Sequence, residues 1–416
     1  MSCPEIVRCN ISQLKFPICD AGIVSLAPGT FHTVLVKQDG SVWSTGVNLD
    51  DRSESFVQVI SSGAVAAAAG NDFSIVLTKD GSVYTTNRNP RTEHSIFDGT
   101  INDKGKFAIS ANIPGAKAVA AGGYHSIVLT QEGRVWVTGW NIYGQLGDGS
   151  TKDNDRFLRV TSSGVLAAAA GDIHSIVLKQ DGSVWGTGRN YYGQLGDGLK
   201  QMSSTRFRKV IPSGANAVAA GETHNIVLKQ DGSVWATGRN QNGQLGDGSK
   251  TDRNCFVKVM HSGAADVAAG GYHSMVLKQD GSVWATGWNK DGQLGDGSIT
   301  DRTNYVQVVL SGVRSVAAGK QHSMVLKQDG SVWARGHNVY GQLGDGSATG
   351  TKEFVQVIPN GVKAVAAGAI HSMVVKEDGS IWATGSNTYG QFGDGSTTSQ
   401  DVFFRLAPYD YGSLQT

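Results

Sequence analysis

Apolar and polar positions repeat along this chain with a period of about 50 residues, in short apolar runs separated by turn residues. Residues 227–238 read VLKQDGSVWATG, and the same twelve letters return at residues 276–287. One changed letter, at Arg335, gives the copy at residues 325–336, and looser copies begin at Val34, Val76, Val128, Val177 and Val374. These eight copies predict an array of one small supersecondary unit.

The repeat at residues 264–311 predicts four short strands and no helix. Its strand-like segments read AADVAAG, HSMVL, SVWAT and YVQVVL. The Asp280-Gly281 pair between the second and third segments is a tight hairpin signal, because Asp-Gly tolerates the left-handed backbone of such turns. A Gly-rich loop, GWNKDGQLGDGS, joins the third segment to the fourth.

These strands carry apolar side chains on both faces, so the predicted sheet is covered on both sides. In HSMVL, Met275 and Leu277 point one way and Val276 the other, whereas a sheet with one wet face would alternate apolar and polar residues. Four-stranded sheets that pack between others like themselves are the blades of a propeller. The small residues Ala268, Ala269 and Gly270 suit the innermost strand, where blades crowd around the axis.

One large ring occupies the same place in every repeat. The members are Trp43, Tyr84, Trp136, Trp185, Trp235, Trp284, Trp333 and Trp382. We expect these rings to fill the gaps between blades rather than to form a row that stacks on a ligand.

Composition and charge narrow the function classes. The chain has 416 residues, 39% of them hydrophobic, and its 56 Gly against 8 Pro indicate tight turns rather than disorder. The formal net charge of +1 makes nucleic acid an unlikely partner. Residues 1–10 resemble no signal peptide and no run is long enough to span a membrane, so we expect a cytoplasmic or nuclear protein with reduced thiols at Cys3, Cys9, Cys19 and Cys255.

The repeated pattern AG-x-x-HS-x-VL followed by DGSVW-x-TG-x-N-x-x-GQLGDGS resembles the repeat of the regulator of chromosome condensation family. The resemblance covers residues 22–407 and implies an all-β propeller that serves as a binding platform for proteins. It divides the chain into an N-terminal segment at residues 1–21, the propeller at residues 22–407 and a tail at residues 408–416. The founding member of the family implies a further function, guanine nucleotide exchange on a Ran-like small GTPase.

The first two repeats depart from that pattern. After Asn48 the first lacks the GQLGDG segment, and the second replaces it with residues 90–115. The family usually closes with seven blades, but both repeats keep four strand-like segments, so we favour eight blades over seven. For ring closure, the segment that begins at Lys15 and ends at Cys19 competes with residues 403–406 for the outer edge of the last blade.

The face that carries the Gly-rich loops varies between repeats, whereas the face that carries the Gln-Asp-Gly hairpins is nearly constant. Trp, Tyr and Arg gather on the variable face, and these residue types carry binding energy at interfaces. We therefore predict that a protein partner binds there, with self-association as an alternative. The predicted contact residues are Phe31, Tyr124, Trp140, Tyr143, Arg189, Tyr192, Arg239, Tyr272, Trp288, His337 and Tyr340.

No catalytic constellation, cofactor motif or metal site emerges from the sequence. One His per repeat recurs in seven repeats, with Phe73 in the eighth, and these residues precede strands that lie too far apart to share one ion. We predict a structural role for them: His32, His125, His174, His224, His273, His322 and His371. The family also implies two other functions, an enzyme inhibitor and a photoreceptor, but the turns hold Tyr124 and Tyr272 where the photoreceptor has Trp.

Overall fold

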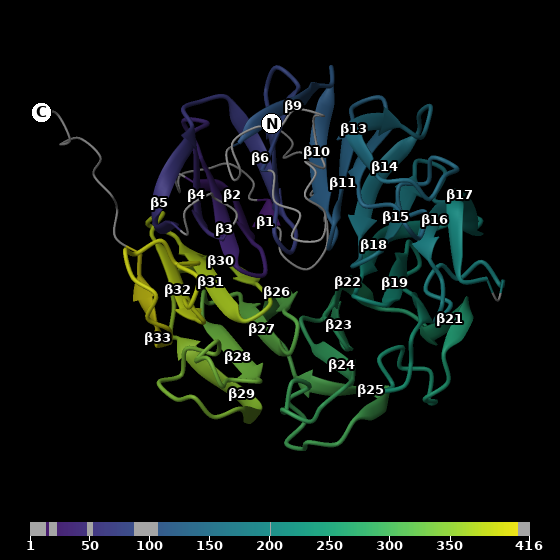
Figure 1. Ribbon diagram of the computed structural model, residues 1–416. Coiled ribbons are helices and arrows are strands. Elements are labelled where there is room, and N and C mark those ends of the chain that lie inside the picture. Colours follow the sequence, from purple (N-terminus) through teal and green to yellow (C-terminus); the bar gives the residue numbers. More distant parts are fainter. Residues whose placement is uncertain (1–13, 16–22, 48–52, 87–106, 200, 407–416) are drawn as a thin grey trace, which may run out of the picture.

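The computed structural model describes residues 14–15, 23–47, 53–86, 107–199 and 201–406, which form a ring of eight β-sheets (Figure 1). Each sheet is one repeat, and its strands pair antiparallel in chain order, so the predicted eight-bladed propeller is confirmed and the seven-bladed alternative is wrong. Within the described residues all regular structure is strand, as the pattern predicted.

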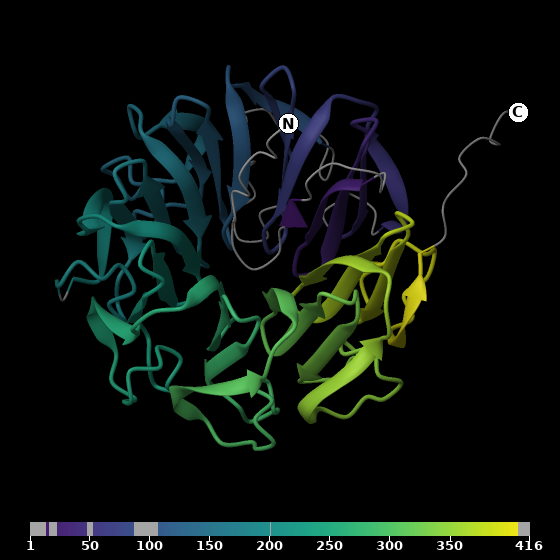
Figure 2. The ribbon, with the colours of Figure 1, turned by 180° about the vertical axis from the view of Figure 1, so that it is seen from behind.

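The four strands of a blade run from the axis outward (Figures 1 and 2). The innermost strands are β2 (Ile23–Pro28), β6 (Ala64–Ala69), β10 (Ala116–Ala121), β14 (Val165–Ala170), β18 (Ala215–Ala220), β22 (Ala264–Ala269), β26 (Val313–Ala318) and β30 (Val362–Ala367). The second strands are β3 (His32–Lys37), β7 (Ser74–Thr78), β11 (His125–Thr130), β15 (His174–Lys179), β19 (His224–Lys229), β23 (His273–Lys278), β27 (His322–Lys327) and β31 (His371–Lys376). The third strands are β4 (Val42–Gly46), β8 (Ser82–Thr85), β12 (Val135–Gly139), β16 (Val184–Arg189), β20 (Val234–Gly238), β24 (Val283–Gly287), β28 (Val332–Gly336) and β32 (Ile381–Gly385). The outer strands are β5 (Ser53–Ile60), β9 (Ala108–Asn112), β13 (Asn154–Arg159), β17 (Ser203–Ile211), β21 (Arg253–Met260), β25 (Arg302–Val309), β29 (Thr351–Ile358) and β33 (Gln400–Arg405).

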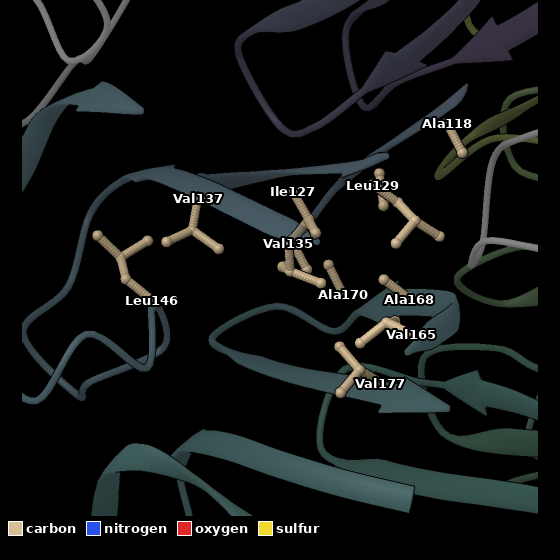
Figure 3. Packing of buried hydrophobic residues seen from close by; sticks show 11 residues of the cluster. Ala118, Ile127, Leu129, Val135, Val137, Leu146, Val165, Ala168, Ala170 and Val177 are labelled. Atoms are coloured by element: carbon tan, nitrogen blue, oxygen red, sulfur yellow. The ribbon is translucent and has the colours of Figure 1, made fainter. Parts of the chain in front are cut away.

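Hydrophobic contacts between adjacent blades form the core. Between blades 3 and 4, Leu129 and Val135 face Val165 and Val177 across the seam (Figure 3). The partly buried Trp185 packs against the same cluster. The seams at other blades carry their repeat Trp in the same place, so the prediction that these rings fill the gaps between blades is confirmed. Small residues dominate the innermost strands because eight of them converge around one axis.

The repeated His rings link neighbouring blades. The Nε2 atom of His125 lies 2.8 Å from Ser175 Oγ in the next blade, and Ser175 Oγ donates to the carbonyl O of Gln145. Equivalent pairs join His224 to Ser274 at 3.0 Å and His273 to Ser323 at 2.8 Å. The predicted structural role thus takes the form of a hydrogen bond to a side chain of the next blade at five positions, whereas His32 and His371 form no such bond. The five are His125, His174, His224, His273 and His322.

The sequence suggested that the two chain ends compete for one sheet edge, and this expectation is wrong. β1 (Leu14–Lys15) pairs with β2 on the axis side of blade 1, whereas β33 occupies the outer edge of blade 8. Every repeat supplies its own four strands in one stretch, so the place of the fourth strand in blade 8 is already filled by β33. Residues 16–19 of that candidate strand, and residues 90–106 of the irregular second loop, lie outside the described residues.

The ring closes through a loop instead. The Gly-rich loop of blade 8 crosses to the outer strand of blade 1, where Gly395 N donates to Glu54 O at 2.8 Å. Phe56 N donates to Gly393 O at 3.2 Å in the same crossing. The equivalent loops bridge blades 3 to 4, 4 to 5, 5 to 6 and 7 to 8, so closure repeats the contact that joins regular neighbours.

Candidate functional site

Each Gly-rich loop is folded around a buried Asn. In blade 5, Asn240 Nδ2 donates to Asp247 Oδ1 at 2.8 Å and to Ser249 O at 3.1 Å, while Asn240 Oδ1 accepts from Leu245 N at 3.0 Å. The same bonds recur around Asn141, Asn289, Asn338 and Asn387. This network fixes the loop, and the residue before the Asn, such as Arg239, lies outside it, half-buried at the surface.

Eight of the predicted contact residues form one unbroken series of ring and cation–π contacts across blades 3 to 6. We call this series the aromatic–arginine arc, and its members in order are Tyr124, Trp140, Tyr143, Arg189, Tyr192, Arg239, Tyr272 and Trp288. Every member is half-buried, so the arc packs against itself and still faces solvent.

Two arginines carry the series from one blade to the next. The Arg189 guanidinium lies 5.3 Å from the ring centroid of Tyr143 and 5.7 Å from that of Tyr192. The Arg239 guanidinium lies 5.1 Å from Tyr192 and 5.5 Å from Tyr272. Among the described residues neither guanidinium forms an ion pair. Each lies against aromatic faces, Arg239 Nη2 donates to Gln241 Oε1 at 3.1 Å, and the charge of Arg189 acts on Asp172.

Edge-to-face aromatic pairs form the two ends of the arc. The Tyr124 and Trp140 rings lie 5.5 Å apart, and the Tyr272 and Trp288 rings lie 5.8 Å apart at an interplanar angle of 89°. Pairs of this geometry restrict the rotation of both rings before any partner binds.

Acidic side chains border the arc on the axis side. Glu222 accepts a hydrogen bond from Tyr272 and pairs with Lys320, whose Nζ lies 3.2 Å from Glu222 Oε1. Burial, followed by the charge and hydrogen bond of Glu222, raises the pKa of Tyr272 to about 12. Burial, followed by the charge of Glu222, raises the pKa of Asp172 as well. The site therefore places positive guanidinium groups beside a negative inner border.

The remaining predicted residues lie apart from the arc. The Phe31 and Tyr389 rings lie 4.8 Å apart at an interplanar angle of 58°, where blade 1 meets blade 8. His337 and Tyr340 contact each other within blade 7, with ring centroids 6.2 Å apart. Sequence reasoning missed Tyr191, which is 57% exposed and lies 5.8 Å from the Arg189 guanidinium. Its place at the tip of a loop already rich in Tyr could have suggested it.

The described residues of the site form no cluster of metal-ligating side chains. In the part of the chain that the structure describes, no three His, Cys, Asp or Glu side chains are placed to hold a metal ion. Burial lowers the pKa of the repeated histidines, to about 3 for His224 and about 4 for His174, and their Nε2 atoms face the next blade. Of the four cysteines only Cys255 lies in the described residues, as an exposed free thiol. The described residues include no helix of the length and apolarity that a membrane crossing needs.

Comparison with known proteins agrees with this architecture. The family model of the RCC1-like domain matches residues 115–410. A crystal structure of yeast RCC1 (Prp20) bound to Kap60 is similar over 71% of this chain and 75% of its own, with 24% identity and a TM-score of 0.60. A second structure, of Prp20p from Saccharomyces cerevisiae, described with its binding to Gsp1p and histones, covers 78% of this chain and 83% of its own, at 24% identity and a TM-score of 0.62.

Human WBSCR16 has the same fold. Its crystal structure covers 75% of this chain and 90% of its own, with 21% identity and a TM-score of 0.60. At these identities the structural likeness shows the fold alone. No curated protein matches the chain.

Proposed function

Because this chain belongs to the family of RCC1-like domains, we propose that it is a non-catalytic protein-binding propeller whose partner docks on the aromatic–arginine arc. The observation that carries this proposal is the unbroken contact series over four adjacent blades, in which each member stays half-exposed. Trp, Tyr and Arg are the residue types most enriched among interface hot spots.

The geometry favours binding because the arc is ordered before the partner arrives. A free surface Arg loses rotamer freedom on binding, whereas Arg189 and Arg239 are already held between rings. Arg239 Nη2 donates to Gln241 Oε1 at 3.1 Å and Arg239 Nε is buried, so Arg189 and Nη1 of Arg239 supply the N–H donors for carboxylate or carbonyl oxygens of a partner. Yeast RCC1 (Prp20), crystallised with Kap60 and described with Gsp1p and histones, supports a protein as the class of ligand.

Affinity capture from a native lysate tests this proposal. We expect a variant with Trp140→Ala, Arg239→Ala and Trp288→Ala to lose the partner that the natural chain captures. The matched control carries Gln230→Ala, Gln279→Ala and Gln328→Ala, three exposed positions in the hairpins of the opposite face. Equal capture by the natural chain and the arc variant would remove the arc from the interface.

Guanine nucleotide exchange on a Ran-like small GTPase is the second candidate function, favoured by the likeness to Prp20p, which is described with Gsp1p. The irregular second loop is the segment to test, because its sequence differs from every other repeat. β9 is the outer strand of blade 2, so a deletion must stop at residue 106 to leave the blade intact. Nucleotide release by the full chain that is lost after deletion of residues 90–106 would favour exchange over simple binding.

The two candidates predict different results in the same assay. A scaffold binds its partner through the arc without changing the release of bound nucleotide, whereas an exchange factor accelerates release at catalytic concentrations. Either function would be exercised in the cytoplasm or the nucleus, the locations that the sequence predicts.

A further inference from the structure

Arg335 occupies a position that holds Thr in all seven other blades. The equivalent residues are Thr45, Thr86, Thr138, Thr187, Thr237, Thr286 and Thr384. These positions lie at the end of the third strand, where a blade meets the Gly-rich loop of its neighbour. In blade 5, Thr237 Oγ1 lies 2.9 Å from Gly193 O of that loop and 2.8 Å from Arg253 O of its own outer strand.

The guanidinium of Arg335 is buried with most of its hydrogen-bonding capacity unused. The side chain has no exposed surface, Nη1 donates to Gly292 O at 3.3 Å, and Nε and Nη2 have no hydrogen-bond partner. Burial lowers the pKa of Arg335, and the charge of Asp296 acts in the opposite direction. An arginine nevertheless stays protonated in proteins, so a positive charge lies inside the seam between blades 6 and 7.

The acid nearest to this charge is already engaged. Asp296 accepts hydrogen bonds from Arg302 Nε, from Ser298 Oγ at 2.8 Å and from Asn289 Nδ2 at 3.0 Å. The face of Phe354, 4.1 Å from the guanidinium, is the other contact that offsets its charge. A buried cation with a shared counterion and two idle donors is costly for a fold, which points to a ligand.

A groove of about 550 Å³ lies beside this arginine, and Arg335 itself is buried behind the wall of the groove. Gly295 and Phe354 line it, and both contact the Arg335 side chain. Trp333 and Val309 form apolar walls, and at one end lies Leu310, which is 81% exposed. The volume falls within the range of about 300–1,000 Å³ that small-molecule sites occupy.

Two further departures from the repeat converge on the same groove. Val309 stands where the neighbouring blades have larger residues, Met260 and Ile358, and this leaves additional space. Leu310 stands at a position that other repeats fill with Ser61, Ser162, Pro212, His261 and Pro359. The three departures, Arg335, Val309 and Leu310, add a positive charge, free space and an exposed apolar side chain at one seam.

We propose that the groove between blades 6 and 7 binds a small amphipathic monocarboxylate. The carboxylate pairs with Arg335, and the hydrocarbon part lies against Trp333 and Leu310. The Phe354 ring covers the guanidinium in this structure, so it rotates into the open groove when the carboxylate enters.

The other charges at the groove restrict the ligand. Lys327 is positive, and its Nζ lies 4.3 Å from the Trp333 ring centroid. Glu353 and Asp296 are negative, and Arg302 offsets the charge of Asp296. With Lys327 at the groove, Arg335 behind its wall and one uncompensated acid, a single negative charge is favoured, and a second would meet Glu353.

Calorimetric titration of the full chain with hexanoate, and with uncharged hexanol as the matched probe, tests this inference. We expect hexanoate to bind at least tenfold more tightly than hexanol, and Arg335→Thr to abolish that difference. Arg335→Thr installs the residue of the sister blades, so it keeps the fold, which urea unfolding verifies. Absence of hexanoate binding to the natural chain, or equal binding by Arg335→Thr, would overturn the proposal.

A second variant tests the apolar half of the site. Leu310→Ser installs the residue of blade 1 and leaves Arg335 in place. We expect it to weaken hexanoate severalfold and acetate not at all, because acetate has no chain to reach Leu310. An equal loss for both acids, or no loss for either, would show that Leu310 does not contact the ligand as proposed.

Discussion

The two faces of the disc are built from the same eight repeats, yet one is a near copy from blade to blade and the other is not. On the hairpin face of blade 5, Asp231 accepts from Ser233, Ser233 accepts from Trp235 Nε1, and Lys229 Nζ lies 4.6 Å from the Trp235 ring. The Lys–Trp contact recurs at Lys37, Lys179, Lys278, Lys327 and Lys376. The Asp, Ser and Lys side chains of this hairpin therefore also support the seam Trp.

On the loop face, support and surface are separate residues. The buried Asn recurs, but the position before it holds Trp140, Arg189, Arg239, Trp288, His337 and Ser386. Because the half-buried Trp140, Arg239 and Trp288 side chains lie outside the Asn-centred bonds, we expect a change at any of them to leave the loop fold intact. The difference between the faces teaches that surface chemistry can vary where the scaffold does not use it.

The largest expected effect is a loss of folding stability in acid, because the repeated histidines are buried. Burial lowers the pKa of seven histidines from 6.5 to about 3 or 4, so the unfolded chain binds more protons than the folded chain below pH 6.5. Stability is fully present above that pH and falls as pH drops toward 4, by up to about 1.4 kcal/mol per pH unit for each histidine.

Seven such losses together exceed the ~5–15 kcal/mol that stabilises a typical domain, so we expect unfolding between about pH 6 and pH 4.5. Urea midpoints followed by Trp fluorescence across this range measure the slope. In His224→Phe, which borrows the residue of blade 2, the slope should decrease by one proton. A stability that is flat from pH 7 to pH 5 would contradict the burial of these rings.

Effects of intermediate size are expected for two tryptophans, one in a seam between blades and one on the loop face. Trp235 packs in the seam between blades 4 and 5, and Trp235→Ala should cost about 3 kcal/mol of unfolding free energy. Trp288 belongs to the arc, and Trp288→Ala should cost about 1 kcal/mol, its edge contact with Tyr272. Urea unfolding at pH 8 compares them. Equal costs would mean that the arc is structural support rather than a surface kept for binding.

The sequence predicts the fold well because each element of the repeat occurs eight times along the chain. The strands, the Asp-Gly hairpins and the Trp in the seams all follow from local pattern and turn chemistry. Closure was harder, since the contact of Gly395 with Glu54 joins the two ends of the chain, and no local pattern shows which neighbour a loop crosses to.

The residue types of the site were predicted from the sequence, but the contacts between them were not. Arg189 and Tyr143 are 46 positions apart, and only the reach of one loop across the next shows that they touch. By the same reasoning Phe31, His337 and Tyr340 looked equivalent to the arc and lie elsewhere. Arg335 is visible as one changed letter, but its burial beside a groove depends on how two blades pack.

The smallest expected effect comes from a substitution in blade 2, the one blade that lacks the repeated histidine. Phe73 takes the histidine position in blade 2, and Ser126 Oγ, the atom in blade 3 that such a histidine would reach, is buried without a hydrogen-bond partner. Gly70 leaves the same space beside Phe73 that Gly122 leaves beside His125. We expect Phe73→His to stabilise the chain by about 0.5–1 kcal/mol at pH 8, the net value of one hydrogen bond.

At pH 5 the sign should reverse, because the new ring becomes an eighth buried imidazole that the unfolded chain protonates first. Ser126→Ala, made alone and together with Phe73→His, isolates the bond, since the gain should vanish when the hydroxyl is absent. If the gain at pH 8 survives in the double variant, the imidazole stabilises blade 2 by packing. The link between blades would then come from shape, and the hydrogen bonds at the other seams would add little to it.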